Sequence, residues 1–277
     1  MHEVGENKLS KIALYLFLFV SAILSIFPFY WMFVVGSNTT SAINKFPPAV
    51  VPGPNFIANS IEVFNRIAFF QALANSIIIS AVVTISVLFF CSLAGFAFSK
   101  LQFKGRDGFF IFVIATMMIP PQLSLIPNFM IMTNLGWVDD LKAVIVPAMV
   151  NAFGVFWMRQ YISSSVPYEL IEAARIDGCG NFRIFLNIVL PAVRPGLATL
   201  GIFTFMMTWN DFLWPLVVLK DSSVHTLQIA LRTLNDVYNT DYSLILTGTF
   251  LATLPILLVF LLFSRQFISG LTEGAVK

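Results

Sequence analysis

Residues 67–99 read IAFFQALANSIIISAVVTISVLFFCSLAGFAFS, and no Asp, Glu, Lys or Arg interrupts this stretch. An α-helix rises about 1.5 Å per residue and the hydrocarbon core of a bilayer is about 30 Å thick, so about 20 apolar residues suffice to cross it. Three further uncharged stretches exceed the spanning length of about 20 residues: Ile12–Asn44, Gly108–Val138 and Tyr242–Ser264. The sequence therefore predicts several transmembrane helices.

The composition of the whole chain supports the same conclusion. Of the 277 residues, 58% are hydrophobic and only 11% are charged, and the mean hydropathy is +0.85. Soluble domains carry about 25% charged residues, because their surface must be hydrated. This composition excludes a soluble enzyme, a nucleic-acid-binding protein and a disordered chain. The net charge of +2 is too small to indicate a polyanionic partner.

We predict six transmembrane helices in an all-α integral membrane protein. Two shorter apolar runs, Ala143–Met158 and Pro195–Asn210, reach spanning length when their polar flanks are included. The expected spans are 12–35, 72–98, 109–131, 142–161, 195–217 and 243–264. Open backbone is not tolerated in lipid, and no alternating ten-residue strands appear, so helices are expected throughout.

The expected organisation has three parts. Residues 1–70 form a retained anchor helix and an outer loop, 71–264 form the main transmembrane domain, and 265–277 form a cytoplasmic tail. Prolines favour an extended path in the outer loop and a kinked or broken third span; these are Pro47, Pro48, Pro52 and Pro54, and Pro120, Pro121 and Pro127.

The distribution of cations predicts the orientation. With the N-terminus in the cytoplasm, eleven Lys and Arg residues fall on inner segments and five on outer ones. The positive-inside rule therefore places both termini in the cytoplasm.

The inner loop at 167–191, PYELIEAARIDGCGNFRIFLNIVLP, has the pattern of two short helices. Pro167 and early glutamates favour a helix start, and Gly178 and Gly180 favour a stop. A second, apolar helix follows and ends at Pro191. The loop is amphipathic and carries both signs of charge, which suits docking into a groove of a soluble partner.

This loop carries a known signature. Glu172-Ala173-Ala174, then Gly178, then Ile188-Val189-Leu190-Pro191 resembles the EAA motif of ATP-binding-cassette (ABC) importer permeases, with the fixed positions of that motif at the required spacing. Residues 208–215 and 270–277 also resemble the smaller permease of maltose-type carbohydrate importers. The resemblance extends from about residue 10 to the end of the chain.

The resemblance implies a type I ABC importer transmembrane domain within a larger assembly. The implied partners are a second homologous permease subunit, two copies of a cytoplasmic ABC ATPase and an extracellular solute-binding protein, in the cell membrane of a prokaryote. Glu172 and Gly178 would make the polar contact and the bend of the ATPase-coupling loop, and the tail Gly274, Ala275, Val276 and Lys277 would reach the ATPases. The full set of expected coupling residues is Glu172, Ala173, Ala174, Asp177, Gly178 and Pro191.

No enzymatic site is expected in this chain. It lacks the G-x-x-x-x-G-K-[ST] loop that binds ATP phosphates, so ATP and Mg²⁺ would be bound by the partner ATPase. Cys91, Cys179, His2 and His225 are too few and too scattered for a metal site or a disulfide framework.

Asp211 is the one carboxylate inside an expected span, and a charge in a membrane is costly. A role in the translocation pathway stands against a structural ion pair or exposure at the membrane boundary. Asn128, Trp209 and Asn210 are the other expected pathway residues. For Trp214 the sequence favours an interfacial anchor over a sugar contact, and Asn128 has an alternative role in binding helices together.

The expected function is the membrane-spanning half of an ATP-driven, binding-protein-dependent importer of a sugar, a di- or oligosaccharide. One alternative is import of another solute, such as glycerol phosphate, on the same scaffold. From another class, an ion-coupled secondary transporter would need coupling charges in its spans, and Asp211 alone qualifies.

Overall fold

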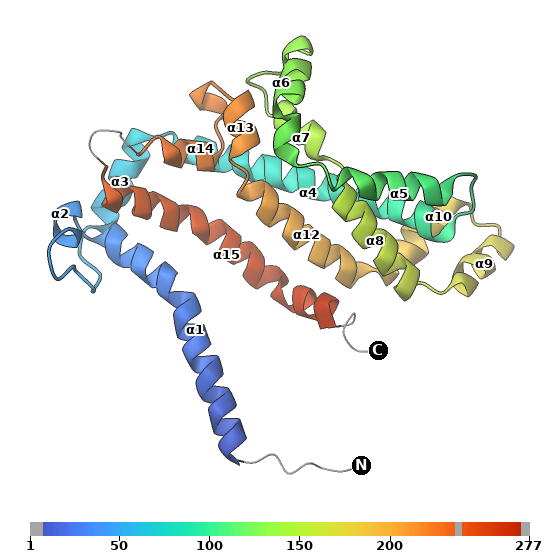
Figure 1. Cartoon of the computed structure of the whole chain (residues 1–277), viewed down its shortest axis with the longest axis horizontal. Helices are drawn as coiled ribbons and strands as arrows, with labels where there is room; N and C mark the ends of the chain where they lie inside the picture. Colours follow the sequence, from blue (N-terminus) through green and yellow to red (C-terminus); the bar gives the residue numbers. More distant parts are fainter. Residues whose placement is uncertain (1–7, 236–239, 273–277) are drawn as a thin grey trace. The chain divides into compact units, whose positions relative to one another are not determined.

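The computed structural model describes residues 8–235 and 240–272, and these ranges contain helices and no strands. The chain divides into two compact units (Figure 1). The first consists of the residues up to Ile67 together with Leu231–Leu254. The second consists of Ala68–Ala230 together with the residues from Pro255 onward. The last helix, α15 (Tyr242–Thr272), contributes to both units.

The described residues contain between four and six segments of spanning length, compared with the six expected spans. In the described residues, four segments are long and apolar enough to cross a membrane: Lys11–Ser37, Phe69–Lys100, Lys142–Ser165 and Tyr242–Leu262. Two bent pairs pass the same test together, Arg106–Thr116 with Pro121–Asn134 at 91° and Asn181–Ala192 with Arg194–Trp209 at 82°. Counting each bent pair as one span gives six, although Asn181–Ala192 overlaps the 167–191 loop that the sequence places in the cytoplasm and lies outside the expected span 195–217.

The first unit contains α1 (Lys8–Ser37), α2 (Thr40–Ile43), α3 (Phe56–Arg66) and the start of α15. Phe33 of α1, Phe56 of α3 and Phe250 of α15 form an aromatic cluster with ring centroids 5.0–5.7 Å apart. The Thr247 hydroxyl donates to the carbonyl of Gly36 at 2.7 Å. The prolines of the expected outer loop predict an extended path. In the structure this loop also contains a helix, α3, after its last proline.

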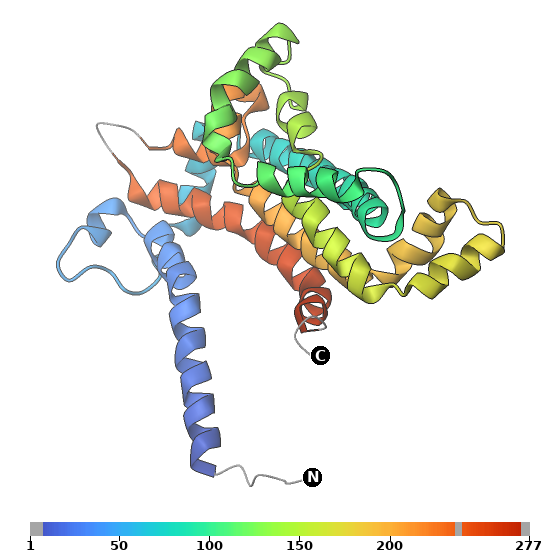
Figure 2. The ribbon, with the colours of Figure 1, turned by 45° about the vertical axis from the view of Figure 1, so that its right-hand side comes forward.

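The second unit is built around α4 (Phe69–Lys100), which packs against α8 (Ala152–Ser165) and α12 (Arg194–Trp209) (Figure 2). Val87 and Phe96 of α4, Met158 of α8 and Leu200 of α12 are almost fully buried in one core. A Cβ atom on Gly95 of α4 would lie 2.7 Å from the backbone nitrogen of Arg159 in α8. Glycine at 95 therefore permits the close approach of these two helices.

Shorter elements complete the second unit. They are α5 (Arg106–Thr116), η1 (Pro121–Ser124), α6 (Leu125–Asn134), α7 (Lys142–Ala148), α9 (Tyr168–Ile176), α10 (Asn181–Ile184), η2 (Phe185–Val189), α11 (Leu190–Ala192), α13 (Leu213–Val218), η3 (Ser222–Val224) and α14 (Leu227–Arg232), which ends in the first unit. Pro120 and Pro121 lie where α5 and α6 are separated, so the expected break in the third span is present.

The fifth span differs from the expectation of one helix over 195–217. Helix α12 ends at Trp209 and α13 begins at Leu213. The Asn210 side chain donates to the carbonyl of Met206 at 2.8 Å, and the Asp211 carboxylate lies against the backbone amides of Phe212, Leu213 and Trp214. Short polar side chains that bond the local backbone in this way compete with continued helix, which explains the break.

Candidate functional site

Helix α9 of the 167–191 loop has the expected boundaries. Pro167 precedes its first residue and Glu169 lies in its first turn. At its end, Gly178 adopts a φ of +80°, the amide of Gly178 donates to Arg175 O at 3.0 Å, and that of Cys179 donates to Ala174 O at 2.9 Å. This pair of bonds is a Schellman cap, which requires a left-handed residue at the position of Gly178.

The second half of the loop is longer than expected. α10, η2 and α11 follow one another without interruption from Asn181 to Ala192, with a wider π-helical turn at Phe185–Val189. Pro191 therefore lies inside the last turn and does not end the helix. Since α12 starts at Arg194 after an 82° bend, the loop continues directly into a membrane helix.

The loop has a buried face and an exposed face. Ile171, Ala174 and Phe185 belong to the core of the second unit. The predicted coupling residues Glu172, Ala173, Asp177, Gly178 and Pro191 are exposed, and only Ala174 among that set is buried.

Large apolar side chains accompany these exposed residues. Leu170, Ile176 and Phe182 are 48%, 87% and 56% exposed, respectively. An exposed apolar surface bordered by charges is typical of a protein contact. The loop thus presents a surface suited to burial against another subunit.

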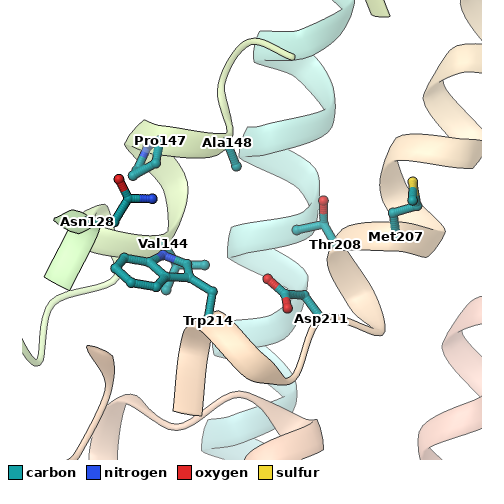
Figure 3. A pocket seen from close by; sticks show the side chains of 8 residues that line it. All are labelled: Asn128, Val144, Pro147, Ala148, Met207, Thr208, Asp211 and Trp214. Carbon is teal, nitrogen blue, oxygen red and sulfur yellow. The ribbon is translucent and has the colours of Figure 1, made fainter. Parts of the chain in front are cut away.

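A cavity of about 400 Å³ lies in the second unit, between α6, α7, α12 and α13 (Figure 3). Its lining residues are Asn128, Val144, Pro147, Ala148, Met207, Thr208, Asp211 and Trp214. A second hollow of about 270 Å³ shares Asn128, Asp211 and Trp214 and adds residues of η1, among them Gln122. These three residues are common to both spaces, which together we call the Asp211 cavity.

The side chains of the Asp211 cavity are fixed by local contacts. The Trp214 indole N–H donates to the carbonyl of Ala143 at 3.0 Å, which links α13 to α7. Asp211 lies at the break between α12 and α13, and the amides facing its carboxylate are those of Phe212 and of the first two residues of α13. In Figure 3 the Asn128 amide and the Asp211 carboxylate lie on either side of the Trp214 ring.

The structure brings two of the four expected pathway residues together. Asn128 and Asp211 line the cavity, whereas Trp209 is 1% exposed and stacks on Phe205 with centroids 5.7 Å apart. Asn210 is exposed and lines neither space. Trp214 and Thr208 also line the cavity, although they are not among the pathway residues expected from the sequence.

Asp139, between α6 and α7, bonds to the segment that follows α13. Its carboxylate accepts from the amides of Lys220 and Asp221, the latter at 2.8 Å, and its own amide donates to Val218 O at 3.0 Å. Asp139 has a φ of +62°, which is rare for a residue with a side chain. These bonds attach the segment after α13 to the segment before α7.

Two carboxylates close to these bonds, those of Asp140 and Asp221, are stabilised in their ionised form. The backbone amide of Lys142 and then its ammonium group, 2.9 Å away, lower the pKa of Asp140. The backbone amide and then the hydroxyl of Ser223 lower the pKa of Asp221. In the part of the chain that the structure describes, no group of three His, Cys, Asp or Glu side chains could hold a metal ion.

Comparison with known proteins identifies the family. Residues 91–268 match the model of the binding-protein-dependent transport system inner membrane component. The chain belongs to this family. It is therefore a multi-pass membrane permease component of an ABC transport system.

Relatives match this permease over nearly its whole length. It is 37% identical to the arabinooligosaccharides transport system permease protein AraQ of Halalkalibacterium halodurans, covering 92% of each chain. It is 36% identical to the lactose transport system permease protein LacG of Rhizobium radiobacter, covering 98% of each. An sn-glycerol-3-phosphate transport system permease protein, UgpE of Agrobacterium fabrum, is 30% identical over 97% of this chain and 98% of its own.

A solved structure has the same fold. It is a bacterial ABC transporter involved in the import of the acidic polysaccharide alginate, with a TM-score of 0.81 and 22% sequence identity, covering 96% of this chain and 99% of the other. The permease therefore has the type I ABC importer fold expected from the sequence.

Proposed function

We propose that this permease forms half of the translocation pathway for a di- or oligosaccharide in an ATP-driven importer. The observation that carries the substrate class is the similarity, above 35% identity across more than nine tenths of the chain, to permeases named for arabinooligosaccharide and lactose transport. The more distant similarity to a glycerol-phosphate permease makes that solute the alternative.

The proposed assembly contains a second homologous permease subunit, two ABC ATPase subunits that bind ATP and Mg²⁺, and an extracellular solute-binding protein. Both termini are then cytoplasmic, and the solute-binding protein docks on the opposite side. The proposed ATPase contact of the tail Gly274–Lys277 lies outside the described residues.

The 167–191 loop is the proposed ATPase-docking element. Its exposed apolar side chains Leu170, Ile176 and Phe182, together with Glu172, support this role, because burial of such a surface favours association. Its inner face is packed in the core, so a force on the exposed face would move the loop as a unit.

A pull-down in mild detergent tests the assembly. Tagged permease should recover a second permease and an ATPase, and ATP-dependent uptake of lactose or arabinotriose by the reconstituted complex should depend on the solute-binding protein. Recovery of a homomeric particle without an ATPase, or uptake driven by an ion gradient in its absence, would refute the proposal and favour a secondary transporter.

A charge reversal tests the docking surface. Glu172→Lys should abolish recovery of the ATPase while the permease pair still forms. Glu62→Lys is a control with the same change in charge; Glu62 lies on α3 in the first unit, where its side chain is 46% exposed and pairs with Arg66. Unchanged ATPase recovery and uptake in Glu172→Lys would contradict the docking role.

A further inference from the structure

The Asp211 cavity contains a carboxylate without a cationic partner among its lining residues. Residues of α6, α7, α12 and α13 surround it, and those that line either space include no Lys, Arg or His. Asp211 is held by the backbone amides of Phe212, Leu213 and Trp214. The ionised form of this carboxylate places a negative charge in the space, with no cation among the lining residues to balance it.

The cation at the start of α7 is engaged elsewhere. The Lys142 ammonium lies 2.9 Å from an Asp140 oxygen and 5.9 Å from the centroid of the Trp137 ring. It is thus committed to two groups outside the cavity. A ligand in the cavity would meet the Asp211 charge without compensation from this lysine.

The remaining lining groups suit a neutral polyhydroxylated ligand. The Trp214 ring is fixed by its bond to Ala143 O and offers an aromatic face. Asn128 supplies both hydrogen-bond donors and acceptors, and the Asp211 carboxylate accepts bonds from hydroxyl groups. A ligand that carries its own carboxylate or phosphate would instead be repelled, because like charges brought together at a desolvated site are unfavourable.

We propose that Asp211 is a specificity-determining residue that makes this cavity accept neutral saccharides and disfavour anionic ones. This inference rests on the proposed function, since it assumes that the cavity belongs to the pathway of a saccharide importer.

The test compares each neutral saccharide with its aldonate, in which oxidation of the reducing-end aldehyde to a carboxylate adds one negative charge. The complete transporter is reconstituted in proteoliposomes, and ATP-dependent uptake of lactose, lactobionate, arabinotriose and arabinotrionate is measured. The ratio of aldonate to neutral uptake in Asp211→Asn is divided by the same ratio in the unmodified protein. The preference of the solute-binding protein cancels, because it is identical in both assays.

We expect Asp211→Asn to raise this ratio about tenfold, since it removes the charge and keeps the shape of the side chain. Glu62→Gln removes one negative charge from an exposed residue that lines neither space, and it should leave the ratio unchanged. An unchanged ratio in Asp211→Asn, with uptake of the neutral saccharide retained, would overturn the inference and leave the proposed function intact.

Other outcomes are equally decisive. If Asp211→Asn abolishes uptake, Asp211→Glu is tested next, because it restores the charge. Recovery of neutral-saccharide uptake together with rejection of the aldonate supports the inference. If neither the uptake nor the rejection is recovered, the inference is overturned. Absence of ATP-dependent uptake of every saccharide by the unmodified complex would overturn both the proposed substrate class and the inference.

Discussion

Gly178 shows how one residue fixes the shape of the 167–191 loop. Its φ of +80° is required by the cap of α9, and a Cβ atom there would meet no other atom within 4 Å. Gly178→Ala therefore tests backbone strain alone, and we expect a cost of about 1–2 kcal/mol. Hydrogen exchange of the amides of Gly178 and Cys179 should accelerate about tenfold or more.

Gly180 provides the matched control for this substitution. A Cβ atom at Gly180 also meets nothing within 4 Å, but the φ of Gly180 is −70°. Gly180→Ala should leave the exchange rates and ATPase recovery unchanged. Equal effects of the two substitutions would show that the left-handed conformation is not the reason for glycine at 178.

Asp139 combines an unusual backbone conformation with two accepted hydrogen bonds. Asn tolerates a positive φ and keeps one acceptor oxygen, Gly tolerates the φ without the acceptor, and Ala satisfies neither requirement. The Tm of the purified permease should therefore be highest for Asp139→Asn, lower for Asp139→Gly and lowest for Asp139→Ala. A Gly variant less stable than the Ala variant would contradict this assignment.

At the scale of elements, the contact between α4 and α8 depends on Gly95. A Cβ atom there would lie 2.7–2.8 Å from Arg159 N and the Met158 carbonyl carbon, which belong to a helix backbone that cannot yield easily. Gly95→Ala should cost about 1–3 kcal/mol through overpacking. Thermal unfolding in detergent measures the loss.

Gly201 of α12 allows a direct comparison within the second unit, on a helix that packs against α4. Its added Cβ would lie 3.4 Å from a terminal carbon of Leu88, an ordinary contact with a flexible side chain. Gly201→Ala should be neutral or slightly stabilising, because alanine favours helix. A loss of stability equal to that of Gly95→Ala would show that the α4–α8 approach is not limiting.

The spans were predictable because their length and lack of charge are properties of the sequence alone. The break after Trp209 was not, since it depends on where the side chains of Asn210 and Asp211 find their hydrogen-bond partners. Asn75 is similar: its amide donates to the carbonyls of Ser223 and His225, both at 3.0 Å, and thereby binds α4 to a loop 148–150 residues away. A partner so distant in the chain leaves no local pattern.

At the scale of the whole molecule, the membrane orientation stays a prediction of the cation distribution. Cys179 lies in the 167–191 loop and is partly exposed, whereas Cys91 is fully buried. An impermeant maleimide should modify Cys179 in inverted vesicles and not in intact cells, and bound ATPase should protect it. A Ser222→Cys, Cys179→Ser variant should show the opposite sidedness; labelling of Cys179 from outside would contradict the topology.

The two candidate sites differ in how far the sequence could predict them. The 167–191 loop is a contiguous motif, so its helix and its cap at Gly178 followed from residue order. The Asp211 cavity is assembled from four separate helices, and composition favoured Trp214 as a membrane-boundary anchor although it lines the cavity. Sequence proximity also suggested Trp209, yet its ring is turned into the core against Phe205.

The bend between α11 and α12 has a mechanical consequence. The loop helix, Asn181–Ala192, and α12 meet at 82°. Thr208 and the helix break at Asp211 lie at the end of α12 that is farther from this bend. With 16 residues, α12 is about 24 Å long, so a rotation of about 5° at the bend would displace that end by about 2 Å. This displacement is comparable to the radius of a water molecule. A rotation of the loop by a few degrees is therefore sufficient to change the shape of a sugar-sized opening.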